Sequence, residues 1–237
     1  MEEKINFLFD VDGTLTPSRL PIDPNFESFF FNWIKNKSVY LITGSDKEKT
    51  IEQIGQDIWK NVTRAYQSCG NQIWENGQLI KEKPFPLTNE LNLFFQEMLS
   101  ISKWDKKFGN HIEERVGLIN FSTIGRNCPQ NEREKYYHWD NIHQERKNIC
   151  TKLMANFPDL EASIGGQISI DIHPNGANKS QILDDISGTI YFFGDKTEKG
   201  GNDYPIVERL EREKRDMKIF TVSSPNETLE ILQKLNY

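Results

Sequence analysis

Short apolar runs alternate with helical patterns at both ends of this chain, and this alternation limits the folds open to it. The apolar runs, each short enough to be a buried strand, cover residues 5–9, 38–43, 189–195 and 218–223. The helical patterns cover residues 25–35, 45–60, 203–211 and 226–235. This rhythm predicts an α/β fold with a doubly wound parallel sheet, built from residues 1–77 and 180–237. Ser45, with Glu48 three residues later, predicts the start of the second helix.

The middle of the chain has a different pattern. A link at residues 83–88 contains two prolines and leads into a helical pattern of leucine, phenylalanine and methionine. Alternating strand patterns at residues 112–123 and 162–174 flank a long charged helix pattern at about residues 131–157. Strands and helices without the strict alternation indicate an α+β insert. We place this insert, a cap domain on the sheet domain, at residues 78–179.

Two aspartates stand where the first apolar run ends, in the sequence FLFDVDGTLT. One interpretation is structural, because aspartates favour turns and an isolated pair of them is often only a turn signal. The alternative is that Asp10 ends a central strand, at the edge where open α/β sheets bind ligands, with Asp12 on the turn beyond it. Two carboxylates this close repel each other unless a cation such as Mg²⁺ neutralises them.

The residues at the other strand ends favour the second interpretation. They are Thr43, Ser45 and Asp46 after the second run, Asp195 after the third, and the segment GGND at residues 200–203. Lys179 lies where the chain re-enters the sheet domain. Because the carboxyl ends of parallel strands share one edge, we predict that these side chains meet Asp10 and Asp12 there. A carboxylate nucleophile, a hydroxyl, a lysine and further acidic groups suit phosphoryl transfer.

The composition excludes several classes of protein. Among 237 residues, 29 are lysine or arginine and 35 are aspartate or glutamate, which gives a formal net charge of -6. This charge argues against a nucleic-acid partner and leaves any anionic ligand to a local group of arginines. Three cysteines without a C-x-x-C pair argue against a disulfide framework and a structural zinc site. Without an apolar run of membrane length or a leader, we expect a cytoplasmic protein with no membrane partner.

The motifs resemble those of the haloacid dehalogenase-like phosphotransferases, in order DVDGT, the strand end TGS, Lys179 and GDKTEKGGND. The segments FLFDVDGTLT-x-x-R, NFSTIGRNC, SIGGQIS-x-D and IYFFGDKTEKGGND resemble the eukaryotic-type α-phosphomannomutase family, and the likeness covers nearly the whole chain. The resemblance implies interconversion of mannose 6-phosphate and mannose 1-phosphate, with Mg²⁺ as cofactor and a hexose 1,6-bisphosphate as activator. It also implies a place on the way to GDP-mannose and a homodimer formed through the cap.

The resemblance assigns different work to the two neighbouring aspartates. It implies that Asp10 is the nucleophile that becomes an aspartyl-phosphate, and that Asp12 is the general acid and base. The first must be ionised to attack, whereas the second must hold or accept a proton. Mg²⁺ would be bound by the carboxylates of Asp10 and Asp195 and by the backbone carbonyl of Asp12.

Lysine and hydroxyl groups complete the implied catalytic set. Lys179 would supply positive charge to the transferring phosphoryl group, and Thr43 or Ser45 would donate a hydrogen bond to it. The sequence reads TGSD where the family often reads GGSD, so both hydroxyls remain candidates. Beyond residue 203 the chain departs from the usual continuation of the family, which puts a second, structural cation site there in doubt.

Four arginines match the phosphate and sugar contacts of the family. They are Arg19, just past the first motif, and Arg115, Arg126 and Arg133 in the cap. The planar fork of arginine binds phosphate oxygens in pairs, although a surface ion pair is the alternative, especially for Arg133 in the charged run NEREK. Alternation at residues 167–173 puts Ser169 and Asp171 on a polar face opposite three isoleucines. We expect both to hydrogen-bond sugar hydroxyls.

Two other functions fit part of the same pattern. A sugar-phosphate phosphatase would admit water to the aspartyl-phosphate, whereas a mutase must exclude water until a sugar hydroxyl arrives. The cap arginines favour the mutase, because they can hold a second phosphate. A catalytically inactive sugar-phosphate binding protein is the third possibility, and the complete set of Asp10, Asp12, Lys179 and Asp195 argues against it.

Overall fold

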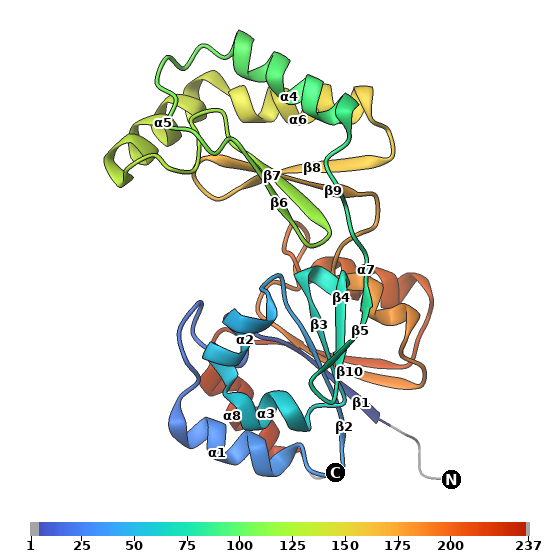
Figure 1. Ribbon diagram of the computed structural model, residues 1–237. Helices are drawn as coiled ribbons and strands as arrows, with labels where there is room; N and C mark the ends of the chain where they lie inside the picture. The colour runs from blue at the N-terminus through green and yellow to red at the C-terminus, as the bar shows by residue number, and fades with distance from the viewer. Residues whose placement is uncertain (1–4, 236–237) are drawn as a thin grey trace. The chain divides into compact units, whose positions relative to one another are not determined.

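The computed structural model describes residues 5–235 and divides into two compact units (Figure 1). The core unit contains Met1–Glu82 and Ala177–Tyr237, and the inserted unit contains Lys83–Gly176. The inserted unit is therefore slightly shorter than the range 78–179 expected for the cap. The difference at its start arises because Gln78–Glu82 forms a strand of the core sheet. None of the helices within residues 5–235 is both long and apolar enough to cross a membrane.

The core unit is built on a seven-stranded sheet with the strand order β11-β10-β1-β2-β3-β4-β5. The strands from β11 to β3 run parallel, as predicted, and β4 and β5 continue the sheet antiparallel at one edge. No long apolar run marks β4 and β5 in the sequence, because each has only two consecutive apolar residues between polar ones and β5 is exposed throughout. The bounds are β1 (Ile5–Asp10), β2 (Ser38–Ile42), β3 (Arg64–Gln67), β4 (Gln72–Glu75), β5 (Gln78–Glu82), β10 (Thr189–Gly194) and β11 (Met217–Thr221).

Helices cover both faces of the core sheet. One face carries α1 (Pro24–Trp33), α2 (Lys47–Ile54), α3 (Gln56–Asn61) and α8 (Pro225–Lys234), and the other carries the 3₁₀ helix η2 (Lys179–Asp184) and α7 (Tyr204–Arg212). Phe7 and Phe9 of β1 pack on the first face, and Leu8 packs on the second. Alternate residues of a strand point to opposite faces, so a strand buried on both faces is apolar throughout. The first charged residue of β1, Asp10, therefore lies at the carboxyl edge.

The helix predicted at residues 45–60 consists of two helices. The Asp46 side chain accepts a hydrogen bond from the backbone N of Lys49, so Asp46 caps α2 and the expectation of Ser45 as the cap is wrong. Gly55 has a φ of 81° and separates α2 from α3. Glycine adopts this conformation without the steric cost that other residues would meet. A short 3₁₀ helix, η1 (Ser68–Gly70), follows β3.

The inserted unit contains a four-stranded antiparallel sheet with the order β6-β7-β9-β8. Its strands are β6 (Ile112–Arg115), β7 (Leu118–Phe121), β9 (Ser169–Pro174) and β8 (Leu160–Gly165). The helices α4 (Asn89–Ile101) and α6 (Glu145–Asn156) cover one face of this sheet (Figure 1), where Phe95 stacks on Phe121. This leaves the opposite face of the sheet for polar side chains.

Two sequence predictions concern the inserted unit. The predicted alternation at residues 167–173 is confirmed, because Ile168, Ile170 and Ile172 are all buried. The single helix predicted at about residues 131–157 is wrong, because α5 (Gln130–His143) and α6 are separate. Gln144 lies between them with a φ of 56°, a left-handed conformation that ends α5.

Candidate active site

Three carboxylates of the core unit lie close together at the carboxyl edge of the sheet. Asp10 ends β1, Asp195 directly follows β10, and Asp203 directly precedes α7. One carboxylate oxygen from each residue lies within 4.8 Å of those of the other two. Asp10 and Asp203 are 2 % and 0 % exposed, and Asp195 is half-buried. The sheet edge thus brings together groups that are far apart in the sequence.

Lys179 begins η2 and places its ammonium group between two of these carboxylates. Its Nζ donates hydrogen bonds to Asp10 Oδ1 at 2.5 Å and to Asp203 Oδ1 at 2.7 Å. The lysine is only 2 % exposed. Charged side chains this deeply buried are tolerated only when they are paired. Lys179 and the two aspartates therefore form one electrostatic group.

Burial is the largest single influence on the pKa values of Asp10, Lys179 and Asp195, and neighbouring charges oppose it. Desolvation raises the pKa of Asp10 to about 7, although the charge of Lys179 opposes the shift. Burial lowers the pKa of Lys179, but the charges of Asp10 and Asp203 outweigh this and leave it above its ordinary value. Burial also raises the pKa of Asp195. With three carboxylates and one ammonium group, a bound cation would favour the ionised form of Asp10.

Two observations show that the cluster fits a hard divalent cation. Asp195 Oδ1 is buried and has no hydrogen-bond partner among residues 5–235. Gly13 has a φ of 85°, and a Cβ there would lie only 2.4 Å from Asp195 Oδ2. Glycine therefore lets the turn after β1 approach Asp195 closely. Carboxylate and backbone carbonyl oxygens are the ligands that Mg²⁺ takes from proteins.

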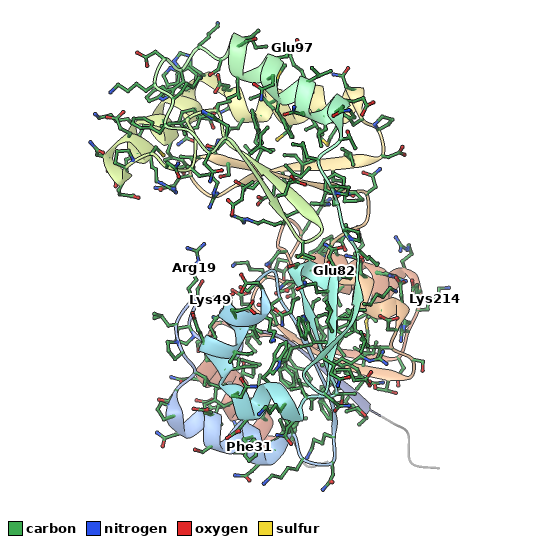
Figure 2. All side chains as sticks on the ribbon, viewed as in Figure 1. Arg19, Phe31, Lys49, Glu82, Glu97 and Lys214 are labelled. Carbon is green, nitrogen blue, oxygen red and sulfur yellow. The ribbon has the colours of Figure 1, made fainter. Side chains whose placement is uncertain are left out.

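Asp12 lies on the turn after β1, held by a helix and by the following loop. Its Oδ1 accepts hydrogen bonds from Gln53 Nε2 at 3.0 Å and from the backbone N of Arg19 at 2.7 Å. The Arg19 side chain is exposed and extends from the surface of the core unit (Figure 2). The structure thus joins Arg19 to Asp12 through its backbone.

The two candidate hydroxyls follow β2. Asp10 pairs in register with Ile42, so Thr43 is the next residue along the neighbouring strand end. Thr43 is buried, and its Oγ1 accepts a hydrogen bond from the backbone N of the half-buried Ser45 at 3.1 Å. Because a hydroxyl both donates and accepts, the proton of Thr43 remains able to bond an acceptor such as a phosphoryl oxygen.

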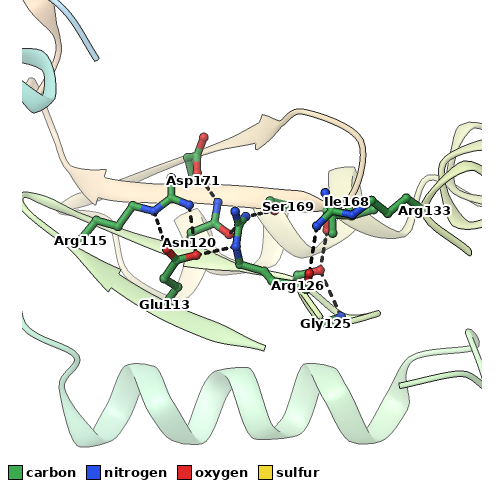
Figure 3. Close-up of polar contacts among 10 residues, drawn as sticks. Glu113, Arg115, Asn120, Gly125, Arg126, Arg133, Ile168, Ser169 and Asp171 are labelled. Atoms are coloured by element: carbon green, nitrogen blue, oxygen red, sulfur yellow. Dashed lines mark hydrogen bonds and ion pairs between the residues drawn. The ribbon is translucent and has the colours of Figure 1, made fainter. Parts of the chain in front are cut away.

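A second polar cluster lies on the sheet of the inserted unit (Figure 3). Arg126, in the loop after β7, donates from Nη1 to Asn120 Oδ1 at 2.8 Å and to Ser169 Oγ at 3.1 Å. Its Nε lies 2.5 Å from Glu113 Oε2. Asn120 Nδ2 in turn donates to Asp171 Oδ1 at 2.6 Å. The cluster thus contains three of the residues assigned to substrate binding: Arg126, Ser169 and Asp171.

The other two arginines of the inserted unit that were predicted to bind substrate, Arg115 and Arg133, differ in their contacts. Arg115 donates from Nε and Nη2 to Glu113, at 3.2 and 3.1 Å, and these hydrogen bonds lower the pKa of that carboxyl. Arg133 instead donates from Nη2 to the backbone O of Arg126 at 2.9 Å. Arg115 and Arg126 therefore share one carboxylate, whereas Arg133 supports the backbone of the loop (Figure 3).

Sequence comparison identifies the family. A family model described as eukaryotic phosphomannomutase matches residues 26–237. This chain belongs to that family. It is 38 % identical to Phosphomannomutase 1 of Dictyostelium discoideum over 242 residues, which covers 97 % of this chain and 96 % of that protein. It is 35 % identical to Phosphomannomutase of Saccharomyces cerevisiae over 240 residues, with 96 % and 92 % of the two chains covered.

Solved structures show that this member of the eukaryotic phosphomannomutase family has the haloacid dehalogenase-like fold. A haloacid dehalogenase-like hydrolase from Bacteroides thetaiotaomicron matches with a TM-score of 0.64 at 12 % identity, covering 98 % of this chain and 99 % of that one. Trehalose-6-phosphate phosphatase of Aspergillus fumigatus matches with a TM-score of 0.65 at 14 % identity, covering 98 % and 92 %. The predicted fold class is therefore confirmed.

Asp203 belongs to the buried carboxylate cluster of the candidate site, whereas sequence reasoning placed it only within the segment GGND. Its Oδ1 accepts from Lys179, and its Oδ2 accepts from the backbone N of Lys196 at 3.1 Å. Both oxygens are therefore used to hold the cluster together. The available signal was the pair of glycines before Asp203, close after the end of β10, which allows the chain to return to the same edge.

Glu113 and Asn120 are also absent from the predicted site residues. Strand register places Glu113, Asn120 and Asp171 opposite one another on three adjacent strands, β6, β7 and β9. The signal was available in β7, because Asn120 is a polar residue between the buried Ile119 and Phe121. Alternation puts such a residue on the face opposite the core.

Proposed function

We propose that this chain is a phosphomannomutase, which interconverts mannose 6-phosphate and mannose 1-phosphate through an aspartyl-phosphate and a hexose 1,6-bisphosphate. The observation that carries the proposal is the buried contact of Lys179 with Asp10 and Asp203, in a chain of the eukaryotic phosphomannomutase family. A carboxylate held beside a lysine at the carboxyl edge of a parallel sheet is equipped to receive a phosphoryl group.

The core unit would carry out both phosphoryl transfers. Asp10 attacks phosphorus as the nucleophile, and Lys179 stabilises the negative charge that the transferring group carries. Asp12 gives a proton to the leaving sugar oxygen and takes one from the attacking hydroxyl in the second transfer. Thr43 or Ser45 donates a hydrogen bond to a phosphoryl oxygen. The carboxylates of Asp10 and Asp195 and the backbone carbonyl of Asp12 would hold Mg²⁺, which neutralises phosphoryl charge when bound. The half-buried Asp195 supports this assignment, because its Oδ1 is without a partner among the described residues.

The inserted unit would bind the phosphate that is not at Asp10. Arg115 and Arg126 both hold Glu113, and a phosphate dianion offers them more charge and more acceptor oxygens than this carboxylate does. The polar row of Asn120, Ser169 and Asp171 would bind sugar hydroxyls. Arg19 would add a further phosphate contact, and Arg133 would act by supporting the backbone of Arg126. A site that keeps the second phosphate favours transfer over hydrolysis.

A phosphate-balance assay tests the proposed function. Purified protein is incubated with mannose 1-phosphate, Mg²⁺ and a trace of hexose 1,6-bisphosphate, and both mannose 6-phosphate and free phosphate are measured. A mutase forms the isomer without releasing phosphate. Release of phosphate alone would instead identify a sugar-phosphate phosphatase, and the absence of both products would point to a binding protein.

The Arg126→Lys variant should lose catalytic efficiency in both directions of the isomerisation. Lysine keeps the charge but loses the fork that contacts Asn120, Ser169 and Glu113 together. Loss of paired, charge-assisted hydrogen bonds to a phosphate should lower kcat/KM by roughly 10- to 100-fold, which steady-state kinetics in each direction will measure.

Acetyl phosphate supplies the control for Arg126. This small donor can phosphorylate Asp10 but carries no second phosphate for the inserted unit. We therefore expect its reaction to change little in Arg126→Lys if wild type accepts it. An equal loss with acetyl phosphate would show that Arg126 acts on the core chemistry or on folding, and the assignment of a phosphate site to the inserted unit would fail.

Mg²⁺ should raise the thermal stability of the protein. Three carboxylates face one lysine in the buried cluster, so a bound cation relieves their repulsion only in the folded state. At about 100 times the dissociation constant, such binding stabilises by about 2.7 kcal/mol. Differential scanning calorimetry should show a shift of the unfolding temperature that Asp195→Asn reduces. Asp184→Asn, which changes an exposed carboxylate paired with Arg209, should keep the full shift.

The family resemblance also supports a proposal about assembly and location. We expect a homodimer formed through the inserted unit, in the cytoplasm, that supplies mannose 1-phosphate for GDP-mannose. Large apolar side chains on the helices of this unit are exposed, among them Leu93 and Ile142 at 69 % and 78 %. Sedimentation velocity of wild type and of a Leu93→Glu variant would test the dimer, because a charge at a dimer contact should favour monomers.

A further inference from the structure

Gln53 connects α2 to the turn that carries Asp12. Its side chain is 1 % exposed, and its Nε2 donates to Asp12 Oδ1 at 3.0 Å and to Thr16 Oγ1 at 2.9 Å. Its backbone O accepts a hydrogen bond from the backbone N of Ile22 at 2.7 Å. One residue in the last turn of α2 therefore holds the loop between Asp12 and Ile22 at three points.

The contacts of Asp12 distinguish its two carboxylate oxygens. Oδ1 accepts from Gln53 Nε2 and from the backbone N of Arg19, at 3.0 and 2.7 Å. Within residues 5–235 no hydrogen bond reaches Oδ2. An oxygen that already accepts two N–H donors is a poor place for a proton. The geometry therefore leaves Oδ2 as the oxygen through which Asp12 exchanges a proton.

The orientation of the Gln53 amide is fixed by its neighbours. The NH₂ group has two protons, and the two acceptors Asp12 Oδ1 and Thr16 Oγ1 use both of them. Rotating the amide by half a turn would point its carbonyl oxygen at the Asp12 carboxylate. In the observed orientation Gln53 Oε1 is buried and lacks a partner in the described part of the chain, which costs stability. The Gln53 amide thus leaves its own carbonyl oxygen without a hydrogen bond while it donates one to Asp12, which indicates a role beyond packing.

We propose that Gln53 is a positioning residue for the general acid and base, which holds Asp12 by Oδ1 so that Oδ2 carries the exchanged proton. The inference rests on the proposed function in one respect, namely that Asp12 exchanges a proton with the substrate. In the first transfer, a bond forms between an Asp10 oxygen and phosphorus while the bond from phosphorus to the sugar oxygen breaks. The proton on Asp12 Oδ2 then passes to that sugar oxygen. In the second transfer the sugar hydroxyl attacks phosphorus, its proton passes to Oδ2, and the Asp10 carboxylate is released.

Leaving groups that differ in their need for a proton test this role. A sugar alkoxide must be protonated as it leaves, whereas acetate leaves acetyl phosphate as a stable anion and needs no general acid. Gln53→Met keeps the side-chain size but removes both donors. We expect kcat with mannose 1-phosphate to fall roughly 10- to 100-fold with little change in KM, the effect of losing a hydrogen bond to a charged group. Phosphorylation of Asp10 by acetyl phosphate should change less than about threefold.

Thr16→Val is the matched control, because it removes the other acceptor of the same amide and leaves Asp12 its two donors. We expect it to retain isomerisation within about threefold, since the hydrogen bond to Asp12 persists. In an Asp12→Asn background, adding Gln53→Met should lower kcat little further, because Gln53 acts through Asp12. If Gln53→Met does not fold, as judged by thermal unfolding, Gln53→Asn replaces it, since its amide is one methylene too short to reach Asp12.

Three outcomes would overturn the inference. They are equal losses with acetyl phosphate and mannose 1-phosphate, a Thr16→Val loss as large as that of Gln53→Met, and a full Gln53→Met loss in the Asp12→Asn background. Failure of the proposed function is a separate result. If wild type forms no mannose 6-phosphate, the comparison is made with phenyl phosphate, a donor whose leaving group also requires a proton. An unequal loss between phenyl phosphate and acetyl phosphate would then support Gln53, and an equal loss would reject it.

Discussion

The Asp10→Asn variant is expected to show no turnover and to keep its fold. An amide is a very poor nucleophile and a weaker Mg²⁺ ligand than a carboxylate, so both the attack on phosphorus and the cation site fail. The fold should survive, because Lys179 keeps its hydrogen bond to Asp203 when Asp10 becomes neutral. Burial already raises the pKa of Asp10 to about 7, so a neutral group at this position is well tolerated.

Two measurements test this expectation together. Isomerisation of mannose 1-phosphate reports turnover, and circular dichroism with thermal unfolding reports the fold. Radiolabelled acetyl phosphate should label wild type and leave Asp10→Asn unlabelled. Turnover near that of wild type would remove Asp10 from the mechanism. A loss of both activity and folded structure would mean instead that the buried carboxylate is required for stability.

The core of the fold could be predicted because its central strands are recognisable in the sequence. Residues 5–9 and 38–43 are buried on both faces of a parallel sheet, so each is an apolar run that ends in a polar residue. The edge strands β4 and β5 carry no such run, since one or both of their faces meet solvent. The helix breaks at Gly55 and Gln144 were not predicted for a different reason. A single residue with positive φ leaves the spacing of apolar residues on either side unchanged.

The candidate site divides in the same way. Asp10, Lys179 and Asp195 follow strands or return to the sheet, so topology alone brings them to one edge. The role of Gln53 could not be predicted from the sequence. The helical pattern of α2 indicates which face is apolar, but it does not indicate which polar side chain of the helix is buried. Glu113 and Asn120 depend on the register between strands, which a hydrophobic pattern sets only after the pairing of the strands is known.

The Lys179→Met variant is the second change from which a large effect is expected. Methionine fills a similar space but leaves Asp10 and Asp203 buried beside each other without a counter-charge. Removing one partner from a buried ion pair costs about 3–5 kcal/mol of stability. The loss of positive charge at the phosphoryl group should lower kcat by roughly 10²–10³-fold in addition. Chemical denaturation and isomerisation kinetics measure the two losses separately. Lys196→Met, which removes an exposed lysine 3.6 Å from Asp195, should cost little in either experiment.

The stability lost in Lys179→Met should grow with pH, which distinguishes charge from packing. Burial raises the pKa of Asp10 from 3.8 to about 7 even though Lys179 lowers it, so without the lysine this pKa rises further. A folded state that holds a carboxyl proton more tightly than the unfolded chain does is most stable below the unfolded pKa, and this stability is lost as pH rises through the folded pKa. With a chelator present, the difference in the free energy of unfolding between wild type and Lys179→Met should therefore be smallest near about pH 4. It should widen through and above pH 7. A gap that stays constant with pH would mean that Lys179 contributes by filling space, because the packing of a methylene chain does not titrate.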